Sequence, residues 1–179
     1  MSKIQVMDEI LANKIAAGEV IDRPASILRE LLDNAVDSGA DFVTVDITGG
    51  GIDSIRVKDN GTGMTKEDLH SCAKPHSTSK ITSEDDLQKL STLGFRGEAL
   101  ASIAAVSRLE ITSLRKGEKI AYKMTAPLAG NGENQVEVAT LSDGTVVSSK
   151  NLFENIPARR LFLKRPATET TLCKQTFIE

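Results

Sequence analysis

Six short segments of this chain alternate apolar and polar residues, which is the spacing of half-buried β-strands. They span residues 42–48, 52–58, 108–114, 118–125, 135–141 and 144–150. Three glycines at 49–51 separate the first two segments, which we therefore expect to form an antiparallel hairpin. Helices are predicted at about 9–17, from Pro24 to Gly39, at 65–73, at 98–106 and over the last 20 residues. This order predicts an α+β fold, a two-layer α/β sandwich with a mostly antiparallel mixed sheet and helices on one face.

Composition limits the class of protein. The 179 residues are enough for one domain with a core of its own, and that core must be aliphatic because the chain has five Phe, one Tyr and no Trp. Cys72 and Cys173 lie far apart and neither is in a C-x-x-C motif, which is typical of a reducing compartment. The net charge of −3 gives no general attraction to nucleic acid or membrane, and no 18-residue apolar stretch occurs. We therefore expect a soluble, intracellular protein.

The helix predicted from Pro24 carries an acid and an amide on its polar side. Glu30 and Asn34 are four residues apart, so they share a face, and we expect that face to point away from the apolar stripe. A carboxylate there can take a proton from water, and an amide oxygen can bind Mg²⁺. The alternative is an exposed polar face with no chemical role, and Asp37 allows the same two interpretations. The predicted stripe consists of Ile27, Leu28, Leu31, Leu32, Ala35 and Val36.

A glycine-containing segment follows the second predicted strand, with the sequence Asp59-Asn60-Gly61-Thr62-Gly63-Met64. Such a sequence is ordinary for a tight turn. In a binding site, the Asp59 carboxylate would accept a hydrogen bond from the exocyclic amine of a base. Gly61 and Gly63 would keep the wall thin enough for a purine to lie against it.

A second glycine pair, Gly94-Phe95-Arg96-Gly97, runs directly into the helix predicted at 98–106. Glycines let backbone amides approach an anion, and the first turn of a helix adds unpaired donors and the positive end of its dipole. The segment is therefore a candidate phosphate site, with plain loop chemistry as the alternative. The long polar stretch before it is a candidate lid.

The order of these motifs, followed by Gly144-Thr145 in a predicted strand, resembles the GHKL ATPases. These proteins share the Bergerat ATP-binding fold and include type II topoisomerase subunits, sensor histidine kinases and DNA mismatch-repair proteins. The chain contains no Gly-Lys pair, which excludes a P-loop nucleotide site. Within the superfamily, the sequences of four segments resemble those of the MutL family of mismatch-repair proteins. They are residues 15–26, 78–81, 94–103 and 155–164.

The resemblance implies a role for each matching residue. Glu30 would be the general base for water attack on the γ-phosphate, and Asn34 would be the Mg²⁺ ligand. Asp59 would bind the adenine amine, with Gly63 beside the ring, Gly61 in the same nucleotide-binding segment and the Thr145 hydroxyl supporting the pocket. A lid at about 74–97 would close over the triphosphate, although Arg96 is equally suited to a salt bridge with Glu98. The other implied nucleotide contacts are Asp37, Thr78, Ser79, Lys80, Gly94, Phe95, Arg96, Gly97, Glu98, Ala99 and Leu100.

The resemblance also implies a function and partners. It implies Mg-dependent ATP binding and slow hydrolysis, which drive a mismatch-repair matchmaker through lid closure and dimerisation. The alternatives are a binding module in which ATP gates dimerisation and DNA contact, or another GHKL ATPase. Implied partners are ATP, DNA, a mismatch recognition protein and a second subunit in a homodimer or heterodimer, with no membrane. The expected location is the cytoplasm of a bacterium or the nucleus of a eukaryote. The one local basic cluster is Arg159, Arg160, Lys164 and Arg165, which is otherwise a solvated helix face.

The extent of the chain gives one more expectation. The resemblance to the MutL family implies an ATPase region of two lobes, followed by a linker and a dimerisation domain. This chain ends at Glu179. We therefore expect residues 1–179 to form the ATP-binding lobe alone, without the second lobe or the C-terminal dimerisation domain. ATP hydrolysis by such a chain would be weak.

Overall fold

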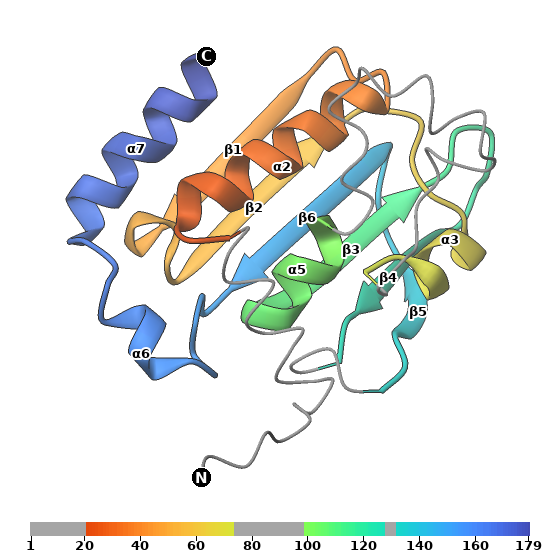
Figure 1. The fold of residues 1–179 in the computed structure, drawn as a ribbon. Coiled ribbons are helices and arrows are strands. Elements are labelled where there is room, and N and C mark those ends of the chain that lie inside the picture. The colour runs from red at the N-terminus through yellow and green to blue at the C-terminus, as the bar shows by residue number, and fades with distance from the viewer. Residues whose placement is uncertain (1–20, 74–98, 128–131) are drawn as a thin grey trace, which may run out of the picture.

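The strands form one six-stranded sheet with the order β1-β2-β6-β3-β4-β5. The computed structural model describes residues 21–73, 99–127 and 132–179 (Figure 1). β6 comes last in the sequence yet lies between β2 and β3, at the centre of the sheet. The strands are β1 (Val43–Thr48), β2 (Ser54–Asp59), β3 (Arg108–Leu114), β4 (Ala121–Thr125), β5 (Gln135–Ala139) and β6 (Gly144–Lys150).

All five neighbouring strand pairs in the described sheet are antiparallel. The predicted strands and the predicted two-layer sandwich are thus confirmed, with strand ends shifted by up to three residues. The sequence predicts a mostly antiparallel sheet, and among these strands the sheet is antiparallel throughout. The reason is local, because β1 and β2, β3 and β4, and β4 and β5 are joined in sequence and fold back on one another.

Helices cover one face of this sheet. In Figure 1, α2 and α5 lie across β2, β6 and β3, while α3 lies over β4 and β5 and α7 packs beside α2. The short turn η1 (Gly49–Gly51), which joins β1 to β2, contacts α7. The helices are α2 (Pro24–Asp37), α3 (Lys66–Ser71), α5 (Ala99–Val106), α6 (Pro157–Arg160) and α7 (Pro166–Ile178).

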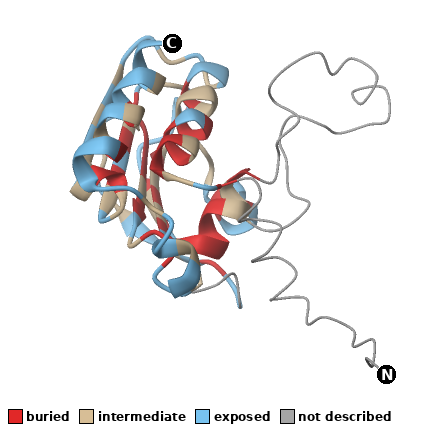
Figure 2. Ribbon diagram, turned by 60° about the vertical axis from the view of Figure 1, so that its left-hand side comes forward, coloured by how far each residue is buried: buried red, intermediate tan, exposed pale blue. Residues whose placement is uncertain are grey.

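The core lies between the helices and the sheet, as the buried residues in Figure 2 show. Alternate side chains of β2, β6 and β3 point into it, while the opposite face carries charged residues such as Arg56 and Glu110. This alternation is normal for an antiparallel sheet with one solvated face. The apolar side chains that meet in the core include Ile27, Leu28, Leu31, Ile55, Val57, Ile103, Leu109, Ile111, Met124 and Val147.

The buried face of α2 differs from the predicted stripe. Val36 is 71% exposed although it was expected in the stripe, and Glu30 is only 4% exposed although it was expected on the outer face. Glu30 follows Ile27 by three residues and Asn34 follows Leu31 by three, so both side chains border the buried stripe instead of opposing it. Helical spacing alone fixes the angle of a side chain, not which neighbouring elements cover it.

The helix ends agree with the capping residues in the sequence. α2 begins at Pro24 and ends before Gly39, whose amide bonds to the Val36 oxygen. The Thr65 hydroxyl accepts a hydrogen bond from the Asp68 amide at 3.1 Å, and the Asp68 carboxylate accepts one from the Thr65 amide. α3 therefore starts where the sequence predicts.

Some expectations lie outside the described residues, namely the helix at 9–17 and the lid at 74–97. Cys72 and Cys173 are both buried free thiols. Within residues 21–73, 99–127 and 132–179, no helix combines the length and the apolar character that a membrane crossing requires.

Candidate functional site

A row of three buried polar residues crosses the middle of the sheet at one end of its helix-covered face. Asp59 of β2 pairs with Thr145 of β6, and Thr145 pairs with Ser113 of β3. Directly opposed residues point to the same face, so the three side chains lie side by side. The next row toward the core, Val57, Val147 and Ile111, is apolar. The row is thus the polar border of an apolar layer.

Ser113 joins this row to the loop that follows β2. Its Oγ lies 2.7 Å from Thr145 Oγ1, accepts a hydrogen bond from the Met64 amide at 2.7 Å, and lies 3.2 Å from the Gly144 oxygen. The sequence analysis did not single out Ser113. The signal that identifies it is the alternation of the segment at 108–114, which puts it on the same face as Leu109 and Ile111.

Asp59 is a buried carboxylate at the end of β2. Burial raises its pKa, and the nearby charge of Asp143 raises it further. The Gly61 amide, which donates a hydrogen bond to Asp59 Oδ1 at 2.8 Å, opposes this shift only in part. The environment therefore disfavours the bare charge, and a ligand that donates a hydrogen bond to the carboxylate would offset the lost hydration.

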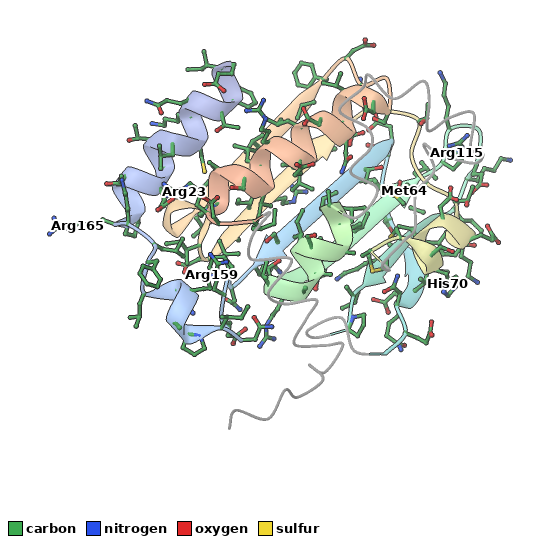
Figure 3. The ribbon with its side chains drawn as sticks, viewed as in Figure 1. Arg23, Met64, His70, Arg115, Arg159 and Arg165 are labelled. Atoms are coloured by element: carbon green, nitrogen blue, oxygen red, sulfur yellow. The ribbon has the colours of Figure 1, made fainter. Side chains whose placement is uncertain are left out.

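The loop at 60–64 is held by backbone bonds on both sides. The Thr62 amide donates to the Ser38 oxygen at 3.1 Å, and the Lys116 amide donates to the Thr62 oxygen at 2.8 Å. Arg115 also donates to the Gly63 oxygen, and Figure 3 shows Met64 and Arg115 at the same end of the molecule. The loop thus lies between the end of α2 and the turn after β3.

The glycines at this end are required by close packing. Gly144 has φ +65°, and a Cβ on it would overlap the carbonyl oxygen of Asp59. A Cβ on Gly63, at φ +72°, would overlap the Leu114 oxygen, and one on Gly61 would overlap Ser38. The structure thus gives Gly61 and Gly63 a packing reason, beside the predicted one of leaving room for a purine.

The three predicted residues of α2 lie at increasing distances along the helix from the loop at 60–64, which we call the Asp59 loop. They are Asp37, Asn34 and Glu30. Asp37 and Asn34 lie within about one turn of Ser38, whose oxygen contacts that loop. Glu30 lies two turns from Ser38, or about 12 Å along the helix axis at 1.5 Å per residue. Asp37 is exposed, Asn34 is half-buried and Glu30 is buried. The helix therefore leads from the polar row toward Glu30.

The remaining predicted contacts are only partly described. Ala99 and Leu100 form the first turn of α5, where Ala99 is buried and Leu100 half-buried. Thr78, Ser79, Lys80 and the residues from Gly94 to Glu98 lie outside the described residues. Across the described ranges, no group of three or more His, Cys, Asp and Glu side chains could hold a metal ion.

The predicted basic cluster lies on and after α6. Arg160, Lys164 and Arg165 are exposed and Arg159 is half-exposed. Two large apolar side chains between them, Leu161 and Phe162, are also exposed. Figure 3 shows Arg159 and Arg165 on the opposite side of the molecule from Met64. The cluster and the polar row are therefore separate surfaces.

Comparison with known proteins identifies related folds. Residues 23–154 match the family described as histidine kinase-, DNA gyrase B-, and HSP90-like ATPase. The chain is 53% identical, over 94% of its length, to the DNA mismatch repair protein MutL of Treponema pallidum, of which it covers 29%. It is 49% identical over its whole length to the MutL protein of Borreliella afzelii, again covering 29%. Thus it spans less than a third of the length of these curated relatives.

A solved structure supports the same likeness. The ATPase domain of Aquifex aeolicus MutL, complexed with ADP, superposes with a TM-score of 0.66 and 31% sequence identity. The match covers 88% of this chain and 54% of that chain.

Proposed function

Because this chain belongs to the histidine kinase-, DNA gyrase B- and HSP90-like ATPase family, among the MutL DNA mismatch repair proteins, we propose that it binds ATP with Mg²⁺ and hydrolyses it slowly. The observation that carries the proposal is the buried row of Asp59, Thr145 and Ser113 at the end of α2. Residues 1–179 act in this proposal as one ATP-binding lobe with its lid at 74–97.

The base of the nucleotide would lie against the polar row. The Asp59 carboxylate is a hydrogen-bond acceptor in a buried setting that favours a donor such as the adenine amine. The Thr145 hydroxyl, on the neighbouring strand, adds a second polar contact. Guanine carries an oxygen where adenine carries the amine, so a carboxylate there favours adenine over guanine.

The phosphates would extend along α2 toward Glu30. Glu30 would take a proton from the water that attacks the γ-phosphate, and its buried position keeps bulk water from competing. Asn34, one turn away, would hold Mg²⁺ together with phosphate oxygens, since Mg²⁺ commonly uses few protein ligands in such sites. Bound Mg²⁺ would supply charge neutralisation on the phosphates. Lys80, Thr78, Ser79 and the segment from Gly94 to Leu100 would complete the site as the lid.

A binding function coupled to the same cycle is the second candidate, and the basic cluster favours it. No acidic residue occurs from 155 to 168, and Glu154 pairs with Arg108 at 2.9 Å. Arg159, Arg160, Lys164 and Arg165 therefore form a local positive surface that suits phosphate contacts to DNA. In this proposal nucleotide binding controls dimerisation and DNA contact during mismatch repair, together with a mismatch recognition protein. Nucleotide-dependent sedimentation and salt-dependent DNA binding measure these two properties.

The central experiment is equilibrium binding of a non-hydrolysable ATP analogue with Mg²⁺. Asp59→Ala is expected to lower the affinity at least about tenfold, because a buried acceptor is lost. Asp46→Ala is the matched control, since Asp46 lies on the adjacent strand and is exposed. Equal affinities of the Asp59→Ala variant and the unmodified chain would place the adenine elsewhere.

A further inference from the structure

Ser113 is the most deeply buried member of the polar row, at 1% exposure. Its hydroxyl contacts three groups from two other segments: the Met64 amide, the Thr145 hydroxyl and the Gly144 oxygen. One oxygen atom therefore connects the loop after β2 to the beginning of β6. Both of these segments contribute residues to the proposed adenine pocket.

The hydrogen-bond capacity of Ser113 is filled by these contacts. A hydroxyl has one proton to donate and two lone pairs. The Met64 amide can only donate, so it occupies one lone pair and leaves the proton and the other lone pair for Thr145 and Gly144. Ser113 thus has no capacity left for a nucleotide. Thr145 differs, because Ser113 is the one partner of its hydroxyl among the described residues, and part of its capacity remains for a ligand.

We propose that Ser113 is a positioning residue for adenine recognition. It holds the Thr145 hydroxyl in place beside Asp59 and fixes the end of the Asp59 loop through the Met64 amide. Without it, the Thr145 side chain can rotate away and the Met64 amide loses its partner. The inference rests on the proposed function, since it assumes that Asp59 and Thr145 contact the base.

The same strands contain a matched control. Ser149 of β6 donates a hydrogen bond to Ser107 at 2.9 Å and is 1% exposed, like Ser113. Ser149 pairs with Ile55 and Leu109, two rows away from Asp59 along the sheet. Ser149→Ala therefore removes a buried serine hydrogen bond away from the proposed pocket.

The test is a double-mutant cycle on the full chain. Ser113→Ala, Thr145→Val, the double variant and Ser149→Ala are titrated calorimetrically with a non-hydrolysable ATP analogue and Mg²⁺. Each is also unfolded in urea. Ser113→Ala and Thr145→Val should each weaken binding about 5- to 10-fold, the loss expected for one hydrogen bond. The double variant should lose clearly less than the product of the two single losses, because both substitutions remove the Ser113–Thr145 contact, whereas only Ser113→Ala also removes the bond to the Met64 amide. Ser149→Ala should bind like the unmodified chain although it also loses stability in urea.

Two results overturn the inference: an unchanged affinity of Ser113→Ala, or losses that multiply in the double variant. If Ser113 had a purely structural role, the losses would multiply in the double variant, or Ser149→Ala would weaken binding as much as Ser113→Ala does. If the unmodified chain binds no nucleotide, the proposed function itself fails. If Asp59→Ala and Thr145→Val weaken binding and Ser113→Ala does not, only the role of Ser113 fails.

Discussion

Replacement of Gly144 by alanine tests how closely β6 packs against the end of β2. Gly144 has φ +65°, and an added Cβ would overlap the Asp59 carbonyl oxygen and lie 2.8 Å from the Asn60 Cα. These are backbone atoms, so no side chain can rotate to make room. A left-handed conformation costs an alanine about 1–2 kcal/mol, and overpacking adds about 1–3 kcal/mol. Together they predict a loss of about 2–5 kcal/mol, a large part of the roughly 5–15 kcal/mol that stabilises a domain.

Gly117 supplies the control for backbone strain alone. Its φ is +90°, yet a Cβ there would meet nothing within 4 Å. Gly117→Ala should therefore lose only about 1–2 kcal/mol. Urea unfolding followed by circular dichroism measures both losses of stability. The overpacking cost of about 1–3 kcal/mol should separate the two midpoints by about 0.5–1.5 M, at a slope of about 2 kcal/mol per molar. The packing argument is refuted if the two variants agree to within about 0.5 kcal/mol.

Four further substitutions follow from the structure. Burial raises the pKa of Asp59 above 3.8, so the folded state holds this proton more tightly than the unfolded state and stability falls as pH rises through the raised pKa. Asp59→Asn should remove that fall in urea midpoints measured from acid to neutral pH; an unchanged slope would contradict it. Glu30→Ala should keep analogue binding and lose at least about 100-fold in hydrolysis rate, and a normal rate would exclude it as the base. Asn34→Ala should make analogue affinity insensitive to Mg²⁺, whereas a retained dependence would reassign the ligand. The Asn134 side-chain amide, whose two protons are shared among three carbonyl oxygens, binds the end of α3; Asn134→Ala should cost about 1–3 kcal/mol in urea unfolding, and no loss would show that these bonds do not stabilise the fold.

Local signals in the sequence account for most of the elements. Alternation predicts all six strands, and Pro24, Gly39 and Thr65 mark the helix ends that the structure shows. These signals work because they depend on near neighbours in the chain, through strand pleating, capping and turn conformation.

Features that depend on distant segments could not be predicted in the same way. No periodicity indicates that β6 inserts between β2 and β3, and so none indicates that Ser113 meets Thr145. The burial of Glu30 also depends on the elements that pack around α2, not on its helix position. The motifs identified Asp59 and Thr145, but only the pairing of β2 with β6 shows that the two side chains lie in one row.

The central position of β6 also sets the order in which the pocket can be assembled during folding. Asp59 and Ser113 lie on strands that do not touch each other, and they are brought into one row only by β6, the last of the described strands to be synthesised. Such distant pairings form slowly, because a long loop must close before any contact is gained. A nascent chain that has reached only β5 therefore lacks the row of residues that forms the proposed adenine pocket. A nucleotide that contacts both Asp59 and Thr145 would stabilise the pairing of β6 with β2. A higher nucleotide concentration would therefore favour the completion of folding.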